Sequence, residues 1–321
     1  MIWRKASFQI QSLTALAHRL DGEHNMLKPG IAAIREHLAT LPDSAGLSVK
    51  QLRSAYDKAE KLFRLPEGLE RTTFDANGVR CERLTPAGAD QSSALLYFHG
   101  GGYALGSPSS HRHMVANIAA QAGISAVVPD YRLAPEAPFP AAVDDALKTY
   151  QWLLDDGVEP SSITLAGDSA GGGLTAATLV SIRDHGLPLP LAGVCISPWA
   201  DMTNAAQSYE TRAEADPMVT KASISRWTAA YLGDTDPRTP LASPAFADLN
   251  GLPPLLIQVG NDEVLLDDAK RLAERAESVG VATTLEVWDD MIHVWHWFAE
   301  YLDEAGEAVA RIAEFIHEQK T

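Results

Sequence analysis

The first part of the chain carries apolar side chains at helical spacing. Between residue 8 and about residue 65 they recur three and four positions apart. A clear example is the set Ile31, Ile34, Leu38 and Leu41. Proline and glycine interrupt the pattern at Pro29, Pro42 and Gly46. This spacing predicts two or three short helices rather than one long one.

The pattern becomes strand-like after these helices. Two extended segments at 71–75 and 79–85 are joined by Asn77-Gly78, a dipeptide that favours a type I′ hairpin turn. Apolar strands then alternate with helical segments. The expected strands are 94–98, 125–130, 163–166, 191–196, 254–259 and 283–287, and the expected helices are 109–122, 141–154, 171–185, 267–279 and 295–317. This order predicts an α/β fold with a mostly parallel central sheet flanked by helices.

The alternation stops between residues 200 and 245. This stretch has a helical patch at 221–232 flanked by several prolines, which indicates an insertion. Open α/β sheets bind ligands beyond the carboxyl ends of their strands. We therefore expect residues 1–65 and the insertion to form a helical cap over that edge, and residues 66–321 to form the catalytic domain.

Composition and charge narrow the class of protein. The chain has 321 residues, 46% of them hydrophobic, and a formal net charge of −16, which disfavours nucleic acid and anionic membranes as partners. No signal peptide and no stretch of 18 apolar residues is evident, so we expect a cytoplasmic protein. Its two cysteines, Cys81 and Cys195, lie in strand-like runs and are expected to be reduced core thiols.

A glycine-rich string identifies a candidate nucleophile. The segment 167–171 reads Gly-Asp-Ser-Ala-Gly and lies between a predicted strand and a predicted helix. A sharp strand-to-helix turn of this G-x-S-x-G type exposes the serine oxygen, and its glycines allow the backbone segments to approach closely. Ser169 is therefore the predicted nucleophile. An anion-binding helix start is the alternative reading of the same glycines.

A second glycine loop supplies candidate hydrogen-bond donors. His99-Gly100-Gly101-Gly102 follows the strand 94–98 directly. Nucleophilic attack on a carbonyl places negative charge on its oxygen, which backbone N–H groups stabilise. We assign these oxyanion-hole donors to Gly101, Gly102 and Ala170. His99 is expected to hold the loop rather than transfer protons.

A serine nucleophile needs a base and an acid. His293 follows the last predicted strand and is the best-placed base, with His296 as its rival. Asp262 is the first carboxylate after the strand 254–259, so it is the expected partner that orients His293. Glu263, Asp267 and Asp268 are the alternatives. Along the chain the three residues occur in the order Ser169, Asp262, His293. This order of nucleophile, acid and base is the one expected when the nucleophile lies on a strand-to-helix turn of this type.

Together these strings resemble the hormone-sensitive-lipase-like family of bacterial carboxylesterases. Further matching segments are 130–136, 139–142, 197–199, 216–218 and 260–268, and the resemblance covers roughly residues 94–298. One departure is Asp290, where the family often has glycine. The resemblance implies the α/β-hydrolase fold, an acyl-enzyme mechanism on short- to medium-chain esters, a helical cap, and no cofactor or metal.

The substrate pocket, the reaction class and the oligomeric state each have alternative interpretations. Tyr103, Leu105, Trp199 and Met218 are weak candidates for the substrate pocket, since apolar residues beside a glycine loop are equally expected in a core. A small-molecule ester is the expected substrate. An amidase or peptidase on the same triad, and a non-catalytic small-molecule receptor, are alternative functions. An exposed edge strand near the C-terminal helix suggests a homodimer as a hypothesis.

Overall fold

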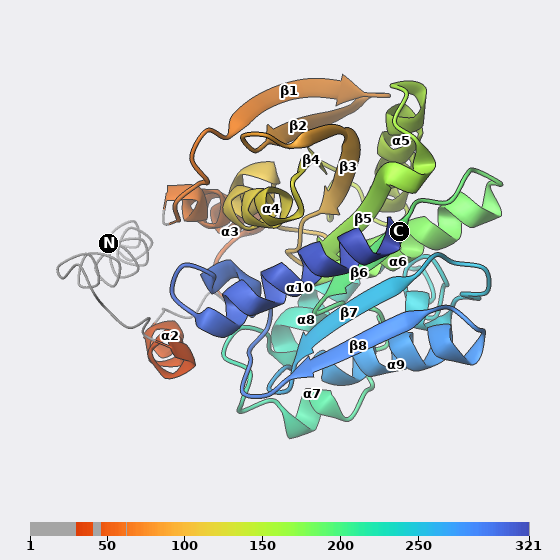
Figure 1. Ribbon diagram of the computed structural model, residues 1–321. Coiled ribbons are helices and arrows are strands. Elements are labelled where there is room, and N and C mark those ends of the chain that lie inside the picture. Colours follow the sequence, from red (N-terminus) through yellow and green to blue (C-terminus); the bar gives the residue numbers. More distant parts are fainter. Residues whose placement is uncertain (1–29, 41–45, 62, 321) are drawn as a thin grey trace.

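A computed structural model describes residues 30–40, 46–61 and 63–320 of the chain. Within these residues, eight strands form one sheet in the order β1-β2-β4-β3-β5-β6-β7-β8 (Figure 1). Their bounds are β1 Glu70–Ala76, β2 Val79–Thr85, β3 Asp90–Phe98, β4 Ile124–Pro129, β5 Ile163–Asp168, β6 Ala192–Ile196, β7 Leu255–Gly260 and β8 Thr283–Trp288. β1 and β2 form an antiparallel pair, β2 pairs antiparallel with β4, and all other neighbours are parallel.

Helices cover the sheet and connect its strands. Their bounds are α2 Gly30–Ala39, α3 Val49–Asp57, α4 Pro108–Ala122, α5 Ala141–Asp155, α6 Ala170–Asp184, α7 Ser208–Thr211, α8 Lys221–Leu232, α9 Leu266–Ser278 and α10 Asp303–Gln319. Short 3-10 helices occur at η1 Lys58–Lys61, η2 Pro160–Ser162, η3 Pro244–Phe246 and η4 Trp295–Phe298. The predicted α/β class with a mostly parallel sheet is confirmed. The helices expected before residue 30 lie outside the described residues.

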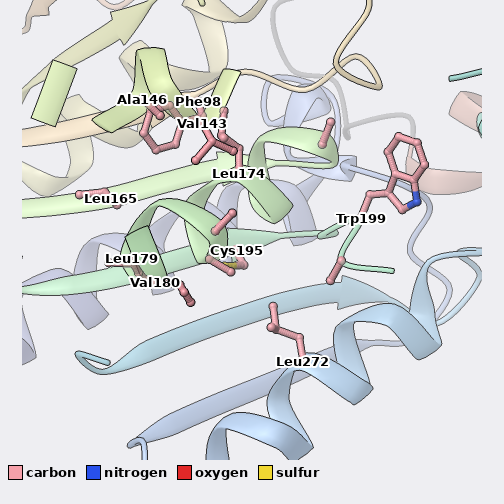
Figure 2. Packing of buried hydrophobic residues seen from close by; sticks show 14 of the residues in the cluster. Phe98, Val143, Ala146, Leu165, Leu174, Leu179, Val180, Cys195, Trp199 and Leu272 are labelled. Atoms are coloured by element: carbon pink, nitrogen blue, oxygen red, sulfur yellow. The ribbon is translucent and has the colours of Figure 1, made fainter. Parts of the chain in front are cut away.

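Alternate residues of each central strand supply two apolar layers. On β3, Leu95 and Tyr97 pack with α4 and α10 on one face, while Leu96 and Phe98 pack with α5 and α6 on the other. Figure 2 shows the second layer, in which Phe98 and neighbouring strand residues face α6. All of these side chains are fully buried, as expected for a parallel sheet covered on both sides.

The turns follow local sequence signals. Asn77 and Gly78 both have positive φ, 54° and 87°, as the predicted type I′ hairpin turn requires. α4 begins with a capping box from Ser107 to Ser110 and ends at Ala122, after which Gly123, with a φ of 64°, forms a left-handed cap. Cys81 and Cys195 are free and buried, as expected.

The C-terminal helix differs from its prediction. We expected one helix over 295–317, but η4 and α10 are separate helices. Leu302 is extended, with φ −138° and ψ 123°, and therefore breaks the helical path. Asp303 and Glu304 then favour a new helix start, because carboxylates stabilise the positive end of the helix dipole.

Two groups of helices fall outside the alternating order of strands and helices. α2 and α3 precede the sheet, and α7 and α8 come from the long connection between β6 and β7. The predicted helical patch in the insertion coincides with α8. No helix in the described part of the chain has both the length and the apolar character needed to cross a membrane.

Candidate active site

Ser169 occupies a strained turn between β5 and α6. Its φ of 55° and ψ of −120° are unusual for a residue other than glycine. The turn brings backbone segments so close that a side chain at Gly171 would collide with the carbonyl oxygen of Phe98. The Ser169 side chain is partly exposed, whereas its neighbours Asp168 and Ala170 are buried. The turn thus presents the hydroxyl at the carboxyl end of the sheet, as predicted for a nucleophile.

His293 lies at the same edge of the sheet, after β8. Its Nδ1 atom is 2.8 Å from Oε2 of Glu263, and both residues are almost fully buried. Burial lowers the pKa of His293, but the adjacent Glu263 carboxylate, together with Asp216 and Asp168, raises it, and the net shift is upward. An Nδ1–H bond to a carboxylate leaves Nε2 free to accept a proton.

The Glu263 carboxylate is itself held by two donors. Oε1 accepts hydrogen bonds from the backbone N–H of Gly260 at 2.7 Å and from the hydroxyl of Ser197 at 2.6 Å. Ser197 in turn accepts a bond from the backbone N–H of Val294, next to His293, at 3.1 Å. Ser197 therefore connects the loop that carries the carboxylate with the loop that carries the histidine.

The expected carboxylate partner needs correction. Asp262 does not contact His293; its Oδ2 atom forms an ion pair with Arg35 at 2.5 Å. The chain turns directly after β7, where the backbone N–H of Glu263 bonds to the carbonyl of Gly260 at 3.3 Å. This turn directs Glu263 inward and leaves Asp262 about one quarter exposed. Glu263, one of the alternatives, is therefore the residue that meets the histidine.

The rival histidine has a different environment. His296 is fully buried, and its Nε2 atom lies 2.8 Å from Oε1 of Gln258 on β7. Burial lowers its pKa to about 3, so the ring stays neutral at ordinary pH. These contacts indicate a packing residue of the core.

The glycine loop after β3 presents free backbone donors. Gly101 and Gly102 have φ values of 113° and 63°, which L side chains rarely adopt. Among the described residues, no backbone or side-chain acceptor bonds to the N–H groups of Gly101, Gly102 or Ala170. The expected oxyanion-hole donors are thus available.

Hydrogen bonds to buried polar groups hold the glycine loop in place. The backbone N–H of Gly100 donates to Oδ1 of Asp168 at 3.1 Å, and the Tyr131 hydroxyl donates to the carbonyl of His99 at 2.6 Å. The His99 ring stacks on Tyr131 with centroids 4.2 Å apart. Burial lowers the pKa of His99 to about 3, which fits the expected holding role and not proton transfer. Sequence reasoning gave no role to Asp168 here, although it stands in the nucleophile string.

The weak pocket candidates separate into two groups. Tyr103 and Trp199 belong to the fully buried core, where Tyr103 stacks on Tyr231 with centroids 3.8 Å apart. Their contacts favour the packing alternative. Leu105 is also buried, whereas Met218 is 38% exposed, and for these two substrate binding stays a prediction.

Trp227 of α8 was not among the candidates but lies against the glycine loop. A side chain at Gly102 would meet the Trp227 indole at 2.9 Å, and Arg226 covers the same indole at 4.6 Å from its centroid. The long-range fold alone brings this tryptophan to the loop, because α8 is about 120 residues further along the chain.

One segment joins the nucleophile to the acid–base pair. The backbone N–H of Ser169 donates to the carbonyl of Ile196 at 2.8 Å, and the N–H of Trp199 donates to the carbonyl of Ser169 at 2.9 Å. Ser197 lies between them and bonds to Glu263. The parallel strands β5, β6, β7 and β8 therefore bring Ser169, Glu263 and His293 to one edge of the sheet.

Comparison with known proteins identifies the family of the chain. Residues 95–297 match a family described by its alpha/beta hydrolase fold. An acetyl-hydrolase of Streptomyces hygroscopicus is 44% identical over 294 residues, which cover 91% of this chain and 97% of that protein.

Solved structures agree with the family match. The crystal structure of an esterase from the bacterial hormone-sensitive lipase family is 48% identical, with a TM-score of 0.86, and covers 91% of this chain and 97% of that chain. An esterase whose crystal was soaked with p-nitrophenyl butyrate is 46% identical, with a TM-score of 0.87, and covers 92% and 99%. The chain therefore belongs to the α/β-hydrolase-fold family and, within it, to the hormone-sensitive-lipase-like esterases.

Proposed function

We propose that the chain is a serine carboxylesterase that hydrolyses short- to medium-chain esters through an acyl-enzyme intermediate. The observation that carries this proposal is the His293–Glu263 pair at the sheet edge where the strained turn presents Ser169. In this proposal Ser169 is the nucleophile, His293 the general base, and Glu263 the residue that orients the histidine.

The proposed reaction uses the free ring nitrogen of His293. Glu263 accepts the Nδ1–H bond, so Nε2 takes the Ser169 proton as the serine oxygen attacks the ester carbonyl. The negative charge on the carbonyl oxygen is stabilised by N–H groups of Gly101, Gly102 and Ala170. The alcohol then leaves with the proton from His293. Water, activated by the same base, hydrolyses the acyl-enzyme and restores the serine.

The glycine loop also bears on the size of the substrate. Trp227 packs against Gly102, one of the proposed oxyanion donors, and so restricts the space beside the carbonyl of a bound ester. A large indole at this position supports a preference for short acyl chains over long ones. The proposed cap, formed by the N-terminal helices and the insertion that contains α8, would provide the rest of the enclosure.

Hydrolysis of a series of p-nitrophenyl esters tests the function. Acetate, butyrate, octanoate and palmitate esters are supplied to the full chain and to Ser169→Ala, and nitrophenol release is followed. We expect turnover on the short esters and a loss of about 10⁴-fold or more in the variant. Turnover that survives Ser169→Ala, or release from a p-nitroanilide but from none of the esters, would contradict the proposal.

We also infer a homodimer that forms through β8. This strand ends the sheet, so one of its edges has no partner strand within the described residues. Val287, on this strand, is 38% exposed. A groove between β8 and α10 runs beside it, lined by Leu285, Val287 and Arg311 among others. An unpaired edge next to α10 supports the pairing with a second copy.

A further inference from the structure

Arg35 joins three separate segments of the chain. It lies on α2, and its guanidinium forms an ion pair with Oδ2 of Asp262 at 2.5 Å. It also donates to the backbone carbonyl of Ala215 at 2.7 Å and to that of Asp290 at 2.9 Å. Its side chain is 27% exposed. One side chain thus links the N-terminal helix α2 to the insertion, to the loop after β7 and to the turn after β8.

Two of these segments carry the proposed acid–base pair. Asp262 is the residue before Glu263, and Asp290 is three residues before His293. The same two loops are already in contact, because the backbone N–H of Asp262 donates to the carbonyl of Met291 at 3.2 Å. Arg35 therefore adds a second connection at the point where the carboxylate loop meets the histidine loop.

Apolar packing places α2 against the histidine loop as well. Ile34 is only 2% exposed and belongs to the same cluster as Met291, Ile292 and Trp295, which flank His293. Ile31 and Leu38 pack against this cluster from the same helix. Because Ile34 is anchored in this cluster, the helix also holds the neighbouring Arg35 in place.

The insertion holds the carboxylate loop from its other side. The guanidinium of Arg212 donates to the carbonyl of Asn261 at 2.7 Å, and Oδ2 of Asp216 accepts the N–H of Val264 at 3.0 Å. The short stretch 261–264 is therefore bonded to the insertion at both ends, and to α2 in the middle through Asp262.

We propose that Arg35 is a positioning residue that aligns Glu263 with His293 by clamping Asp262 and the carbonyl of Asp290. This inference rests on the proposed function. It also gives a role to Asp262, which sequence reasoning had placed in the triad. The Arg35 guanidinium donates from two separate nitrogens, Nη1 to Ala215 and Nη2 to Asp262 and Asp290. A lysine ammonium has its three donors on one nitrogen and cannot reproduce this planar, spread geometry.

The proposal predicts a specific kinetic signature. Loss of the clamp lets the two loops move relative to each other, so Glu263 and His293 spend less time in the productive geometry. Arg35 has no contact with the glycine loop or with Ser169 among the bonds described, so ester binding should change little. We expect kcat to fall while KM stays near its original value, because misplacement by about 1 Å costs up to about 100-fold in rate.

The experiment measures kcat and KM for p-nitrophenyl butyrate at a temperature well below the unfolding midpoint of every variant. We expect Arg35→Ala to lower kcat between about 10-fold and 100-fold. Arg35→Lys should restore only part of this loss. In Arg35→Ala/Asp262→Asn the effect should not exceed that of Arg35→Ala alone, since the two side chains act through one contact.

Arg183 provides a matched control. It also bonds to two backbone carbonyls, those of Asp248 and Asn250, and to one carboxylate, Asp184, but it lies at the far end of α6 from Ser169. Arg183→Ala should keep both kinetic constants. An equal loss in Arg183→Ala and Arg35→Ala would overturn the proposal, because it would point to general destabilisation.

Failure of this inference is distinct from failure of the proposed function. If Ser169→Ala abolishes turnover but Arg35→Ala keeps the original kcat, the proposed esterase function is retained and the positioning role of Arg35 is wrong. If Arg35→Ala does not fold, Asp262→Asn tests the same contact with a side chain of equal size. An unchanged kcat in folded Asp262→Asn would then reject the proposal.

Discussion

At the level of single residues, the two adjacent carboxylates after β7 have different environments. Glu263 is fully buried and meets His293, while Asp262 is partly exposed and meets Arg35. The difference arises because Gly260 and Ser197 donate to Oε1 of Glu263 and so hold its other carboxylate oxygen next to Nδ1 of His293. Substitution of the two residues should therefore give effects of very different size.

Glu263→Gln should nearly abolish ester hydrolysis. The amide oxygen must stay with the donors Gly260 and Ser197, so the amide NH₂ faces Nδ1 of His293. The ring then carries its proton on Nε2, the wrong tautomer for a base, and we expect kcat to fall by about 10⁴-fold. Asp262→Asn should also lower kcat, but by no more than about 10-fold. Equal losses in the two variants would contradict the assignment of Glu263.

The charge change should also move the pH profile of any residual activity. Burial lowers the pKa of His293 and Glu263 raises it, with a net increase. The base works only when neutral, so activity rises with pH through this raised pKa. Removal of the carboxylate charge lowers the pKa, so the acid limb in Glu263→Gln should shift to lower pH. Buried Asp216 and Asp168 also raise this pKa and remain in the variant, so the shift is partial.

Short sequence motifs were sufficient to predict part of this site. Ser169 and the glycine loop follow their strands directly, and His293 lies five residues after β8, so strand topology brings them to one edge. The choice between Asp262 and Glu263 depends on which way a short turn directs each side chain. Donors at Gly260 and Ser197 decide this, and Ser197 is 66 residues away in the sequence. Arg35 is 227 residues from Asp262 in the sequence and belongs to none of the motifs.

At the level of elements, the helix α8 is the part of the insertion that packs against the glycine loop. The sequence predicted its existence from the helical patch at 221–232, and in the structure the helix begins with a capping box at Thr220. Its position could not be predicted, because Trp227 reaches Gly102 only through long-range packing. This contact is the basis for a prediction about acyl-chain length.

Trp227→Ala should extend the range of esters that the protein hydrolyses. Removal of the indole opens space beside Gly102, so longer acyl chains gain apolar contacts that butyrate is too short to use. We expect the ratio of kcat/KM for p-nitrophenyl octanoate over butyrate to rise by about tenfold or more. The ratio is measured directly with both esters in parallel assays.

Trp152 offers the matched substitution for this test. It is a partly buried tryptophan on α5 that packs on Phe74 at 4.4 Å between centroids and has the guanidinium of Arg83 at 5.7 Å. It therefore resembles Trp227 in size and in its cation contact but faces β1. Trp152→Ala should leave the chain-length ratio unchanged. A ratio that rises equally in both variants would indicate loosening of the whole fold.

At the level of the whole molecule, the two end strands of the sheet carry different side chains. The first end is formed by the hairpin β1–β2, whose β1 residues are mostly exposed and polar. The other end is β8, which has neither lysine nor proline to prevent pairing with another strand. The proposed homodimer would pair β8 with β8 of a second copy and extend the sheet.

The oligomeric state of two surface variants tests this pairing. Light scattering of the original chain should give twice its mass of 34.5 kDa. Val287→Lys places a charge on the exposed edge and should give one chain, whereas Val279→Lys, at an equally exposed valine after α9, should keep the dimer. Each copy carries a net charge of −16, so added salt should strengthen the association by screening the repulsion between copies. A mass of one chain at all concentrations and salt levels would reject the pairing, and dissociation by both lysine variants would place the interface elsewhere.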